Sequence, residues 1–437
     1  MNFVVEIEKM GHRGMGIARR GGKVVLVPFA APGDQAEISI THVHRDYDEA
    51  EIIKLIKPSS LRREPPCPFF GVCGGCQMQH LFISFQRTLK EKIFREMLRH
   101  QVGVSEKVVK ELLFSSNEFH YRFHSELHVN WREKPLVGFM APRDNKVVPI
   151  KQCLVVHPLI QSMLAEVTAI LKKANANQVT DAAISCDFPG VKNVITFFAL
   201  KRLPDNLQKT LVEAVQEIPQ VKGLYLIPRK ERKPIILWKE VGAPSGVLYS
   251  VPFKDRKEDL ILEAWPGVFR QVNPEVNRIV ISVVLDWIQR LEVQHVLELY
   301  SGMGNFTLPI SYVTQDILAI ESNPRAVENA KANALGYNRK NIHWITGSVK
   351  EEIKSLRKKS FDLIIMDPPR KGAKEILKEI IQLNAKNIIY ISCEPATLAR
   401  DIQFLKKYGS YGIEITQPLD MFPQTFHVES ITLLKKI

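Results

Sequence analysis

Hydrophobic residues alternate with polar ones in short runs over the first part of the chain. Between residue 1 and about residue 58 these β-type runs are FVVEIEKM, KVVLVPF, AEISITHV and EAEIIKLI, and glycine-rich turns such as GHRGMG separate them. Several short strands at this spacing predict a small β-barrel. The next stretch, KPSSLRREPPCP, is rich in proline, serine and charge, which is typical of a linker.

The remaining chain shows two further patterns. Residues 67–265 mix strand-like runs (SELHVNW, VGFMA, NVITFFALK) with an amphipathic helix near QSMLAEVTAILKKA, which predicts a mixed α+β domain. In residues 271–437 the strand-like runs HVLELY, DILAIES, NIHWITG, FDLIIMDPP, AKNIIYIS and GIEITQPLD alternate with helical ones. That alternation predicts a parallel, doubly wound Rossmann-like sheet with ligands at the carboxyl ends of its strands. We therefore expect a multidomain α/β protein of three parts, 1–58, 67–265 and 271–437.

Composition narrows the choice of partner. The 437 residues include 60 lysines and arginines against 47 acidic residues, a formal net charge of +13, which favours a polyanion such as nucleic acid. Basic residues in the barrel loops are candidate oligonucleotide contacts, with a solvated charged surface as the alternative. They are His12, Arg13, Arg19, Arg20 and Lys23. No run of about 18 apolar residues or secretory signal is evident, so we expect a cytoplasmic protein with reduced cysteines and no membrane contact.

Two loops of the third part carry features of a cofactor site. VLELYSGMGNFTLPIS places a Gly302-x-Gly304 turn between a strand and a helix, and Glu321 ends the next strand about twenty residues later. Glycine lets the backbone approach a ligand, and an acid at that spacing accepts hydrogen bonds from ribose, so an adenosine-containing cofactor is indicated. An ordinary turn with a solvated glutamate is the alternative. FDLIIMDPPRKG then ends a strand in Asp367, and this order of motifs resembles class I S-adenosylmethionine-dependent methyltransferases.

Cys393 ends the run IIYISCEPATLARD, where a strand opens into a loop. Methylation of carbon 5 of uracil needs a thiolate at this kind of position, because that carbon becomes nucleophilic only after a thiolate adds to carbon 6. A base must later remove the carbon 5 proton, and FPQTFHVESITLL supplies Glu429. Taken singly, Cys393 would be a small buried residue and Glu429 a solvated charge. The joint presence of both residues with the cofactor loops favours catalysis.

The whole set resembles the RNA 5-methyluridine methyltransferase family, most closely its large-subunit (23S) ribosomal RNA members with an OB-like N-terminal TRAM barrel. The resemblance runs through GHRGMGIARRGGKVVLVPFAAPGD, CPFFGVCGGCQMQHL, FRQVNPEVN, ELYSGMGNFTLP, DPPRKG, SCEPATLARD and FPQTFHVES. It implies that Cys393 is the nucleophile and Glu429 the base in methylation of a 23S ribosomal RNA uridine. We expect the enzyme to be a monomer. The cofactor pocket would include Gln271, Tyr300, Gly302, Asn305, Glu321, Ser348 and Asp367, with Ser348 where Asp or Asn is more usual.

A second cysteine set is separate from catalysis. Cys67, Cys73 and Cys76 form C-x5-C-x2-C, and Cys153 is a candidate fourth ligand. Four thiolates fit either a [4Fe-4S] cluster or a tetrahedral zinc, and unliganded core cysteines are the alternative. The family resemblance favours the [4Fe-4S] cluster. Cys186 has no partner in this scheme, and we expect a structural role for it.

Three other functions stay open at this stage. A transfer RNA uridine methyltransferase would use the same chemistry on another RNA. A methyltransferase acting on an amino group would keep Asp367 but tolerate loss of Cys393, and an iron–sulfur RNA-binding protein would consume no methyl donor. If the first reading holds, the target uridine must leave its stack, and Phe269 and Arg270 are candidate stacking partners.

Overall fold

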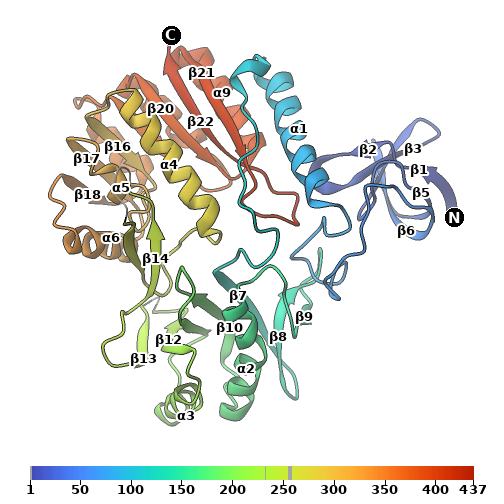
Figure 1. The fold of residues 1–437 in the computed structure, drawn as a ribbon, viewed down its shortest axis with the longest axis horizontal. Helices are drawn as coiled ribbons and strands as arrows, with labels where there is room; N and C mark the ends of the chain where they lie inside the picture. The colour runs from blue at the N-terminus through green and yellow to red at the C-terminus, as the bar shows by residue number, and fades with distance from the viewer. Residues whose placement is uncertain (1, 232, 254–257) are drawn as a thin grey trace.

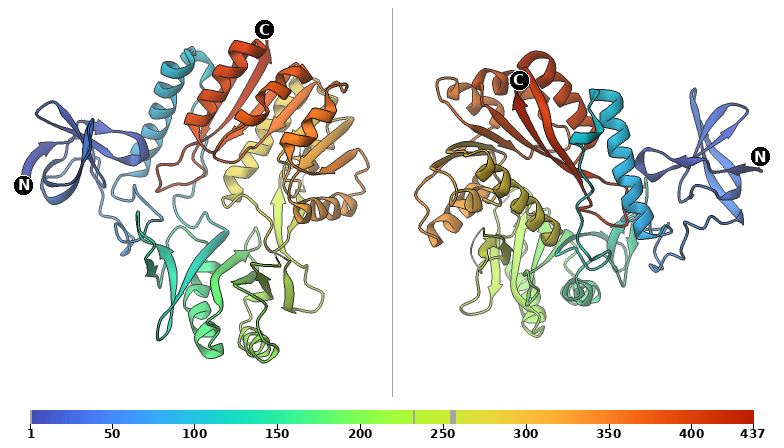
Figure 2. Two further views of the ribbon diagram at one scale, coloured as in Figure 1. Left: turned by 180° about the vertical axis from the view of Figure 1, so that it is seen from behind. Right: turned by 45° about the horizontal axis from the view of Figure 1, so that its top comes forward.

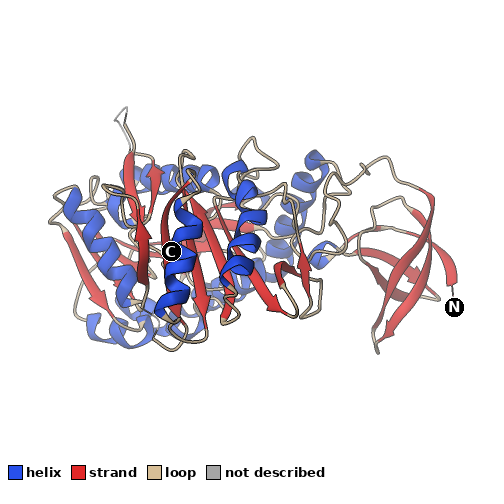
Figure 3. Ribbon diagram, turned by 90° about the horizontal axis from the view of Figure 1, so that it is seen from below, coloured by secondary structure: helices blue, strands red, loops and turns tan. Residues whose placement is uncertain are grey.

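The computed structural model describes residues 2–231, 233–253 and 258–437. Its N-terminal part is a six-stranded sheet in the order β1-β5-β6-β4-β3-β2, which projects to one side of the molecule (Figures 1 and 3). The strands are β1 (Asn2–Glu6), β2 (Lys9–Met10), β3 (Gly16–Arg20), β4 (Lys23–Val27), β5 (Gln35–Val43) and β6 (Tyr47–Lys57), with the 3-10 turn η1 (His12–Gly14). Inward-facing small and β-branched residues, among them Val25 and Ile38, form its own core. The runs expected to be strands here are strands.

The central part is a seven-stranded sheet in the order β13-β12-β11-β10-β7-β8-β9. Its strands are β7 (His124–Trp131), β8 (Pro135–Met140), β9 (Val147–Pro149), β10 (Val179–Cys186), β11 (Asn193–Ala199), β12 (Val221–Pro228) and β13 (Ile235–Lys239). Helices α2 (Pro158–Ala174) and α3 (Asp205–Gln216) pack on it. The expected amphipathic helix is α2, whose buried residues recur at helical spacing from Ile160 to Ala174. Proline at its first position and left-handed Asn175 at its end account for its boundaries.

The C-terminal part is a second seven-stranded sheet, ordered β18-β17-β16-β19-β20-β22-β21. Its strands are β16 (His295–Leu299), β17 (Asp316–Glu321), β18 (Ile342–Thr346), β19 (Leu363–Met366), β20 (Asn387–Ser392), β21 (Tyr411–Leu419) and β22 (Glu429–Lys436). Around it lie α4 (Pro274–Arg290), α5 (Thr307–Ile310), α6 (Pro324–Gly336), α7 (Val349–Glu352), α8 (Leu377–Leu383) and α9 (Pro395–Gly409), with η3 (Ile353–Leu356) and η4 (Lys374–Ile376). The doubly wound prediction is thus correct for β16–β20, which are parallel.

The last two strands depart from that prediction. β22 runs antiparallel to both β20 and β21. Residues 420–428, which join β21 to β22, are too few for the crossover that a parallel pair requires. The expectation of a wholly parallel sheet was therefore wrong at this edge, and the antiparallel turn determines where Glu429 lies.

Two segments that precede residue 265 pack on the C-terminal sheet rather than on the central one. Helix α1 (Ile83–Val102) lies beside α9, where Phe94 and Leu98 join the same core as Leu405 (Figures 1 and 2). After η2 (Glu106–Val108), the chain forms single bridges to Thr416 and Leu419 of β21. The spatial division of the molecule is therefore not the linear division that the sequence suggested.

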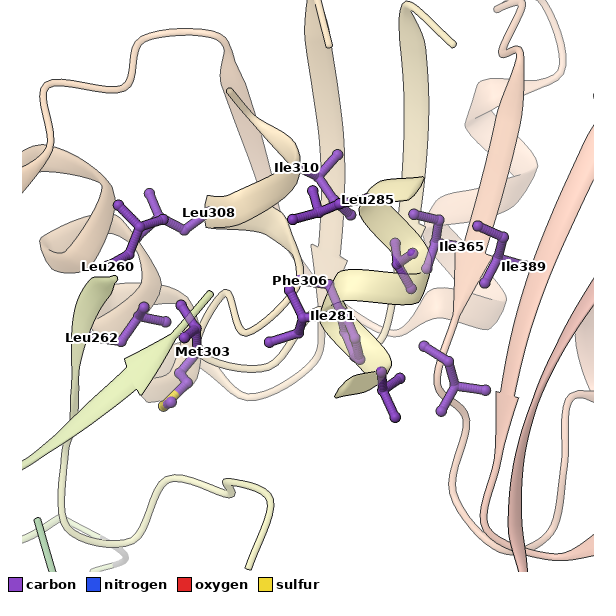
Figure 4. Packing of buried hydrophobic residues seen from close by; sticks show 14 of the residues in the cluster. Leu260, Leu262, Ile281, Leu285, Met303, Phe306, Leu308, Ile310, Ile365 and Ile389 are labelled. Atoms are coloured by element: carbon purple, nitrogen blue, oxygen red, sulfur yellow. The ribbon is translucent and has the colours of Figure 1, made fainter. Parts of the chain in front are cut away.

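The hairpin of β14 (Val247–Val251) and β15 (Leu260–Ala264) is the second such segment. Figure 4 shows Leu260 and Leu262 facing Met303 and Leu308, with Ile281 of α4 close by. These side chains belong to one buried cluster. Within the described part of the chain, no helix combines the length and apolar character needed to cross a bilayer.

Candidate active site

A cavity of about 710 Å³ opens at the carboxyl edge of the C-terminal sheet. Each of the five parallel strands ends at a residue that lines it. These residues are Tyr300 after β16, Glu321 at the end of β17, Ser348 after β18, Asp367 after β19 and Cys393 after β20. Phe269, Gln271, Gly302 and Glu429 are the other predicted residues that line this cavity. The structure therefore brings together residues that span more than 150 positions of sequence, as parallel strands predict.

The glycine loop is shaped to leave room for a ligand. Gly302 has a φ of +57° and no other atom within 4 Å of where a Cβ would lie. Its N–H donates to Glu321 Oε2 at 3.1 Å, and the N–H of Asn323 donates to Glu321 Oε1 at 2.7 Å. The Glu321 carboxylate is thus held at the end of its strand with further acceptor capacity, which suits the hydroxyls of a ribose.

Asp367 lies on a loop that the following helix holds in place. Gln271 Nε2 donates to Asp367 Oδ2 at 3.5 Å, and burial raises the pKa of Asp367 to about 7. Further along the loop, the N–H of Ala373 and the hydroxyl of Tyr390 both donate to Asp401 Oδ2, at 2.7 and 2.8 Å. A buried carboxylate with several donors is a strong anchor, so the Asp-Pro-Pro loop is fixed relative to β20 and α9.

Cys393 and Glu429 meet across the β20–β22 pair. The antiparallel register pairs Ser392 with Ser430, so Cys393 and Glu429 occupy facing positions one step beyond it. Burial, together with the nearby carboxyl groups of Glu429 and Asp367, raises the pKa of the Cys393 thiol to about 11, and the Arg370 guanidinium opposes that rise. The start of α9 at Pro395 also favours negative charge close to the thiol.

Glu429 is buried, and this burial raises the pKa of its carboxyl to about 8. Asp367 adds to the rise in that pKa and Arg370 opposes it. His427, two residues earlier, also lines the cavity and lies 4.3 Å from Phe426 between ring centroids. Burial, with the charges of Arg370, Lys90 and Arg122, lowers the pKa of His427 to about 4, so the imidazole is neutral at physiological pH.

Hydrogen bonds from distant segments hold the 420–428 loop that leads to Glu429. Four successive carbonyl groups accept them. Asn273 Nδ2 donates to Met421 O at 3.1 Å, Lys90 Nζ to Phe422 O at 3.0 Å, Tyr121 Oη to Pro423 O at 3.0 Å, and the N–H groups of Gln77 and Met78 to Gln424 O at 3.0 Å each. These external hydrogen bonds hold the irregular loop in a defined conformation.

Gln424 is the centre of that network. It is fully buried, and its φ of +69° is uncommon for a residue with a side chain. Its backbone N–H donates to Gln86 Oε1, and its Oε1 accepts from Gln86 and Arg63, while its Nε2 donates to Glu118 Oε2 at 3.1 Å. The surrounding contacts therefore stabilise an otherwise unfavourable backbone conformation beside the candidate base.

Two predicted positions do not reach the cavity. The side-chain amide of Asn305 exchanges two hydrogen bonds of 2.9 Å with that of Asn277 on α4, and Asn305 is not among the lining residues. Arg270 is buried and donates to Phe123 O at 2.8 Å, so stacking on a flipped base is not available to it. Its neighbour Phe269 is 71% exposed and lines the cavity.

Sequence reasoning left some lining residues without a role. Arg370, His427 and Phe422 all border the cavity. Arg370 belongs to the DPPRKG motif, and Phe422 and His427 to FPQTFHVES, so the motifs contained the signal. The motifs alone do not show which of their side chains point into the cavity.

The second cysteine set lines a separate cavity of about 330 Å³. Cys67, Cys73, Cys76 and Cys153 all border it, and none of them forms a disulfide. Burial raises the pKa of Cys73 and Cys153, and that of Cys76 to about 12. Among the described residues, no three His, Cys, Asp or Glu side chains are arranged to hold a single metal ion. Cys186 is buried in the core of the central sheet, away from this cavity.

Together, the fold and the main site define a Rossmann-like methyltransferase in which a cysteine and a buried carboxyl face each other. Comparison with known proteins identifies the family. The family model for tRNA (uracil-5-)-methyltransferase matches residues 84–437, and one for the TRAM domain of tRNA (uracil(54)-C(5))-methyltransferase matches residues 3–61. The chain belongs to this family, and it is therefore an S-adenosylmethionine-dependent RNA uracil-C5 methyltransferase with an N-terminal TRAM domain.

Individual relatives extend over the whole chain. A 23S rRNA (uracil(1939)-C(5))-methyltransferase RlmD of Thiobacillus denitrificans is 33% identical, with 100% of both chains covered. The protein of the same name from Haemophilus parainfluenzae is 31% identical over 99% of this chain and 96% of its own. Among solved structures, the tRNA (uracil-54, C5)-methyltransferase of Pyrococcus abyssi, in complex with S-adenosyl-L-homocysteine, has a TM-score of 0.73 at 23% identity over 99% of both chains. That structure shows that the fold is shared.

Proposed function

We propose that this protein transfers a methyl group to carbon 5 of a uridine in 23S ribosomal RNA through a covalent Cys393 adduct. The observation that carries the proposal is the facing placement of Cys393 and Glu429 at the rim of the cavity that also holds Glu321 and Asp367. A thiol and a carboxyl that both reach one uracil ring are what addition to carbon 6 and removal of the carbon 5 proton need.

The relatives support ribosomal RNA as the substrate. Two relatives that cover the whole chain at 31–33% identity carry the 23S rRNA name, and a third at 31% is named only as an RNA methyltransferase. The family model and the solved structure carry transfer RNA names, and the solved structure is less similar at 23% identity. A transfer RNA uridine remains the second candidate, because the same catalytic pair would serve it.

S-adenosylmethionine fits the larger part of the cavity. Glu321 would accept from the ribose, and the open space at Gly302 would let the backbone approach the ligand closely. Gln271 and Asp367 would border its amino-acid end. When bound, S-adenosylmethionine supplies a methyl group on a positively charged sulfur. Asn305, whose side chain is hydrogen-bonded to Asn277, would hold the glycine loop in position rather than contact the cofactor.

In the proposed reaction, the Cys393 thiolate adds to carbon 6 and makes carbon 5 nucleophilic. After methyl transfer, the Glu429 carboxylate removes the carbon 5 proton, the 5,6 double bond re-forms, and the thiolate leaves. Burial disfavours the ionised forms of Cys393 and Glu429 alike. Arg370 lowers the pKa of both groups, so we assign it the role of stabilising their charged states.

The test is methylation of undermodified ribosomal and transfer RNA with labelled methyl donor, followed by mass spectrometry of the nucleosides. We expect 5-methyluridine in 23S ribosomal RNA, loss of all product in Cys393→Ala, and normal product in the matched Cys186→Ala variant. Product only in transfer RNA would keep the chemistry and overturn the substrate. Methylated adenine or cytosine would overturn the reaction itself.

We further propose that Cys67, Cys73, Cys76 and Cys153 hold a [4Fe-4S] cluster. Four cysteines that form no disulfide and line one cavity of about 330 Å³ supply the usual ligand set for it. Gly74 lies so close to Met140 O that an added Cβ would come within 2.9 Å of it, so the backbone is packed tightly around the cavity. The bound cluster would link residues 67–76 to Cys153. The first of these segments continues into Gln77 and Met78, whose N–H groups donate to Gln424 O, so the cluster would also be connected to the 420–428 loop.

Iron and sulfide content of anaerobically purified protein tests this assignment without reference to activity. We expect about four irons per chain, near-complete loss in Cys76→Ser, and full retention in Cys186→Ala. Zinc in place of iron, or unchanged iron in Cys76→Ser, would contradict it. In this arrangement residues 1–58 act as an RNA-binding TRAM-like barrel, 67–265 carry the cluster, and 271–437 carry out catalysis.

A further inference from the structure

A third cavity, of about 530 Å³, lies on the other side of Cys393. It shares Cys393 and His427 with the cofactor cavity, and no step of the proposed reaction uses it. Its walls come from the turn between β2 and β3 of the N-terminal sheet, from α1, and from the start of α9. Three parts of the molecule that are distant in sequence thus meet at the nucleophile.

The N-terminal turn is docked against the catalytic part. Gly14, with a φ of +68°, lies so close to Phe426 that an added Cβ would be 3.3 Å from the Phe426 Cβ. Met10 packs in a small buried cluster with Met78 and Leu89, and Phe426 lies against that cluster. The turn therefore has a defined position next to the loop that bears His427, and the cavity is a built feature of the molecule.

The lining has an apolar floor and a charged rim, and the carboxyl groups of Glu96 and Glu394 line the cavity as well as cations. Met10, Ile17, Met97, Phe426 and Val428 supply the floor. Lys9, Arg13 and His100 are exposed at the rim, and within the described part of the chain Lys9 and Arg13 have no hydrogen-bond or ion-pair partner. An apolar surface beside free cations suits a nucleobase that is still attached to its phosphate.

We infer that this cavity binds the base of a nucleotide adjacent to the target uridine, with the connecting phosphate at Lys9 and Arg13. The inference rests on the proposed function, because it takes the target uracil to lie over Cys393. A nucleotide covalently joined to that uracil has to lie next to it, and the cavity that shares the Cys393 wall is the neighbouring space.

The cavity also gives the N-terminal turn a role in choosing the uridine. Phosphate contacts carry no sequence information, whereas a pocket for a base does. A site that accepts one flanking base would discriminate among uridines by their neighbours. The +13 formal charge of the chain would attract RNA of any sequence, and this cavity would select the target uridine by its neighbouring base.

The experiment uses the full-length protein and a set of short RNAs that contain the unmodified target uridine. In each RNA one flanking nucleotide is replaced by an abasic residue. In the unsubstituted enzyme, we expect one abasic position to lower kcat/KM for RNA roughly 10-fold, the scale of one stacked base. Ala396→Phe narrows the cavity from α9. This variant should lose a similar factor on intact RNA and show little further loss on the abasic RNA.

A second pair of variants separates the rim from general electrostatics. Arg13→Ala should raise KM for RNA several-fold with kcat retained. Arg45→Ala, which changes an exposed residue of the turn between β5 and β6 outside this cavity, should change neither. Retained adduct formation with a 5-fluorouridine RNA in Ala396→Phe would show that Cys393 itself is intact.

Two results would overturn the inference while leaving the proposed function standing. One is methylation that is indifferent to every abasic replacement. The other is an abasic penalty that persists undiminished in Ala396→Phe. If the unsubstituted protein methylates no uridine in any RNA, the proposed function fails and the inference fails with it.

Discussion

Cys393 and Glu429 must both be ionised during catalysis, yet each lies where burial favours its neutral form. Burial raises the pKa of the thiol to about 11 and that of the carboxyl to about 8. At pH 7, about a tenth of a carboxyl with such a pKa is ionised. The two carboxyl groups of Asp367 and Glu429 also raise the pKa of the thiol. Before substrate binds, the neutral forms of the Cys393 thiol and the Glu429 carboxyl therefore predominate at pH 7.

Replacement of Glu429 by Gln should separate the two halves of the reaction. The amide cannot remove the carbon 5 proton, so we expect the covalent RNA adduct to accumulate while turnover falls by about 10²- to 10⁴-fold. Denaturing gels that resolve the adduct provide the measurement. Glu414→Gln, which changes an exposed side chain of β21, is the matched control and should turn over normally. Normal turnover in Glu429→Gln would assign the proton to another base.

The same residue gives a pH dependence. Because the pKa of Glu429 is raised, its carboxylate fraction grows as the pH increases from 7 to 9. Breakdown of a preformed adduct should therefore become faster over this interval and level off above about pH 8 to 9. A rate of adduct breakdown that falls with pH would contradict a carboxylate base.

At the residue scale, sequence motifs predicted that the candidate reacting groups follow strand ends, and the structure places them there. Asp367 and Cys393 each come directly after a run of buried β-branched residues. Asn305 shows the limit of that reasoning. Its position in the loop suggested a ligand contact, but its amide is bound to Asn277, and nothing in the glycine loop itself points to that partner. Partners across space decide where a side chain points.

The 420–428 loop is the element on which the candidate base depends. Its conformation is irregular, includes a left-handed glutamine, and is held by the linker, α1 and the segment that follows Cys76. An antiparallel turn held in this way can place Glu429 without regular secondary structure. No local pattern in FPQTFHVES predicts that geometry, since its partners lie far earlier in the chain.

Gln424→Ala should misplace that loop. It removes the side-chain hydrogen bonds to Gln86, Arg63 and Glu118, each of which keeps another partner, so we expect a cost of about 0.5–1.5 kcal/mol of unfolding free energy for each lost bond. We expect kcat to fall with KM for RNA little changed, because Gln424 lines neither the cofactor cavity nor the cavity on the other side of Cys393. Gln424→Glu keeps the acceptor oxygen and should restore part of kcat.

Gln417→Ala is the control for that variant, because its amide makes a single hydrogen bond to Glu111 O on the exposed side of β21. Urea unfolding gives the stability change, and single-turnover methylation gives the rate. If Gln424→Ala loses stability but keeps its single-turnover rate, the residue stabilises the fold without positioning the base.

Over the whole molecule, the sequence predicted the classes of the three parts but not how they meet. Composition shifts and periodicity locate the β-rich beginning, the mixed middle and the Rossmann-like end. They cannot show that α1 packs on α9, because an amphipathic helix does not specify its partner. Nor can they show that Gly14 packs against Phe426 and so brings the N-terminal sheet to the nucleophile. These junctions depend on shape complementarity between distant surfaces.

The hydrogen bond between Gln86 and Gln424 joins residues that are 338 positions apart. A ribosome adding about 5–20 residues per second makes the second of them on the order of 20–70 s after the first. Helix α1 therefore emerges long before the strands that cover Phe94 and Leu98 exist. During that interval its apolar face is exposed to chaperones and proteases, so the yield of active enzyme in a cell depends on how well the nascent chain is protected.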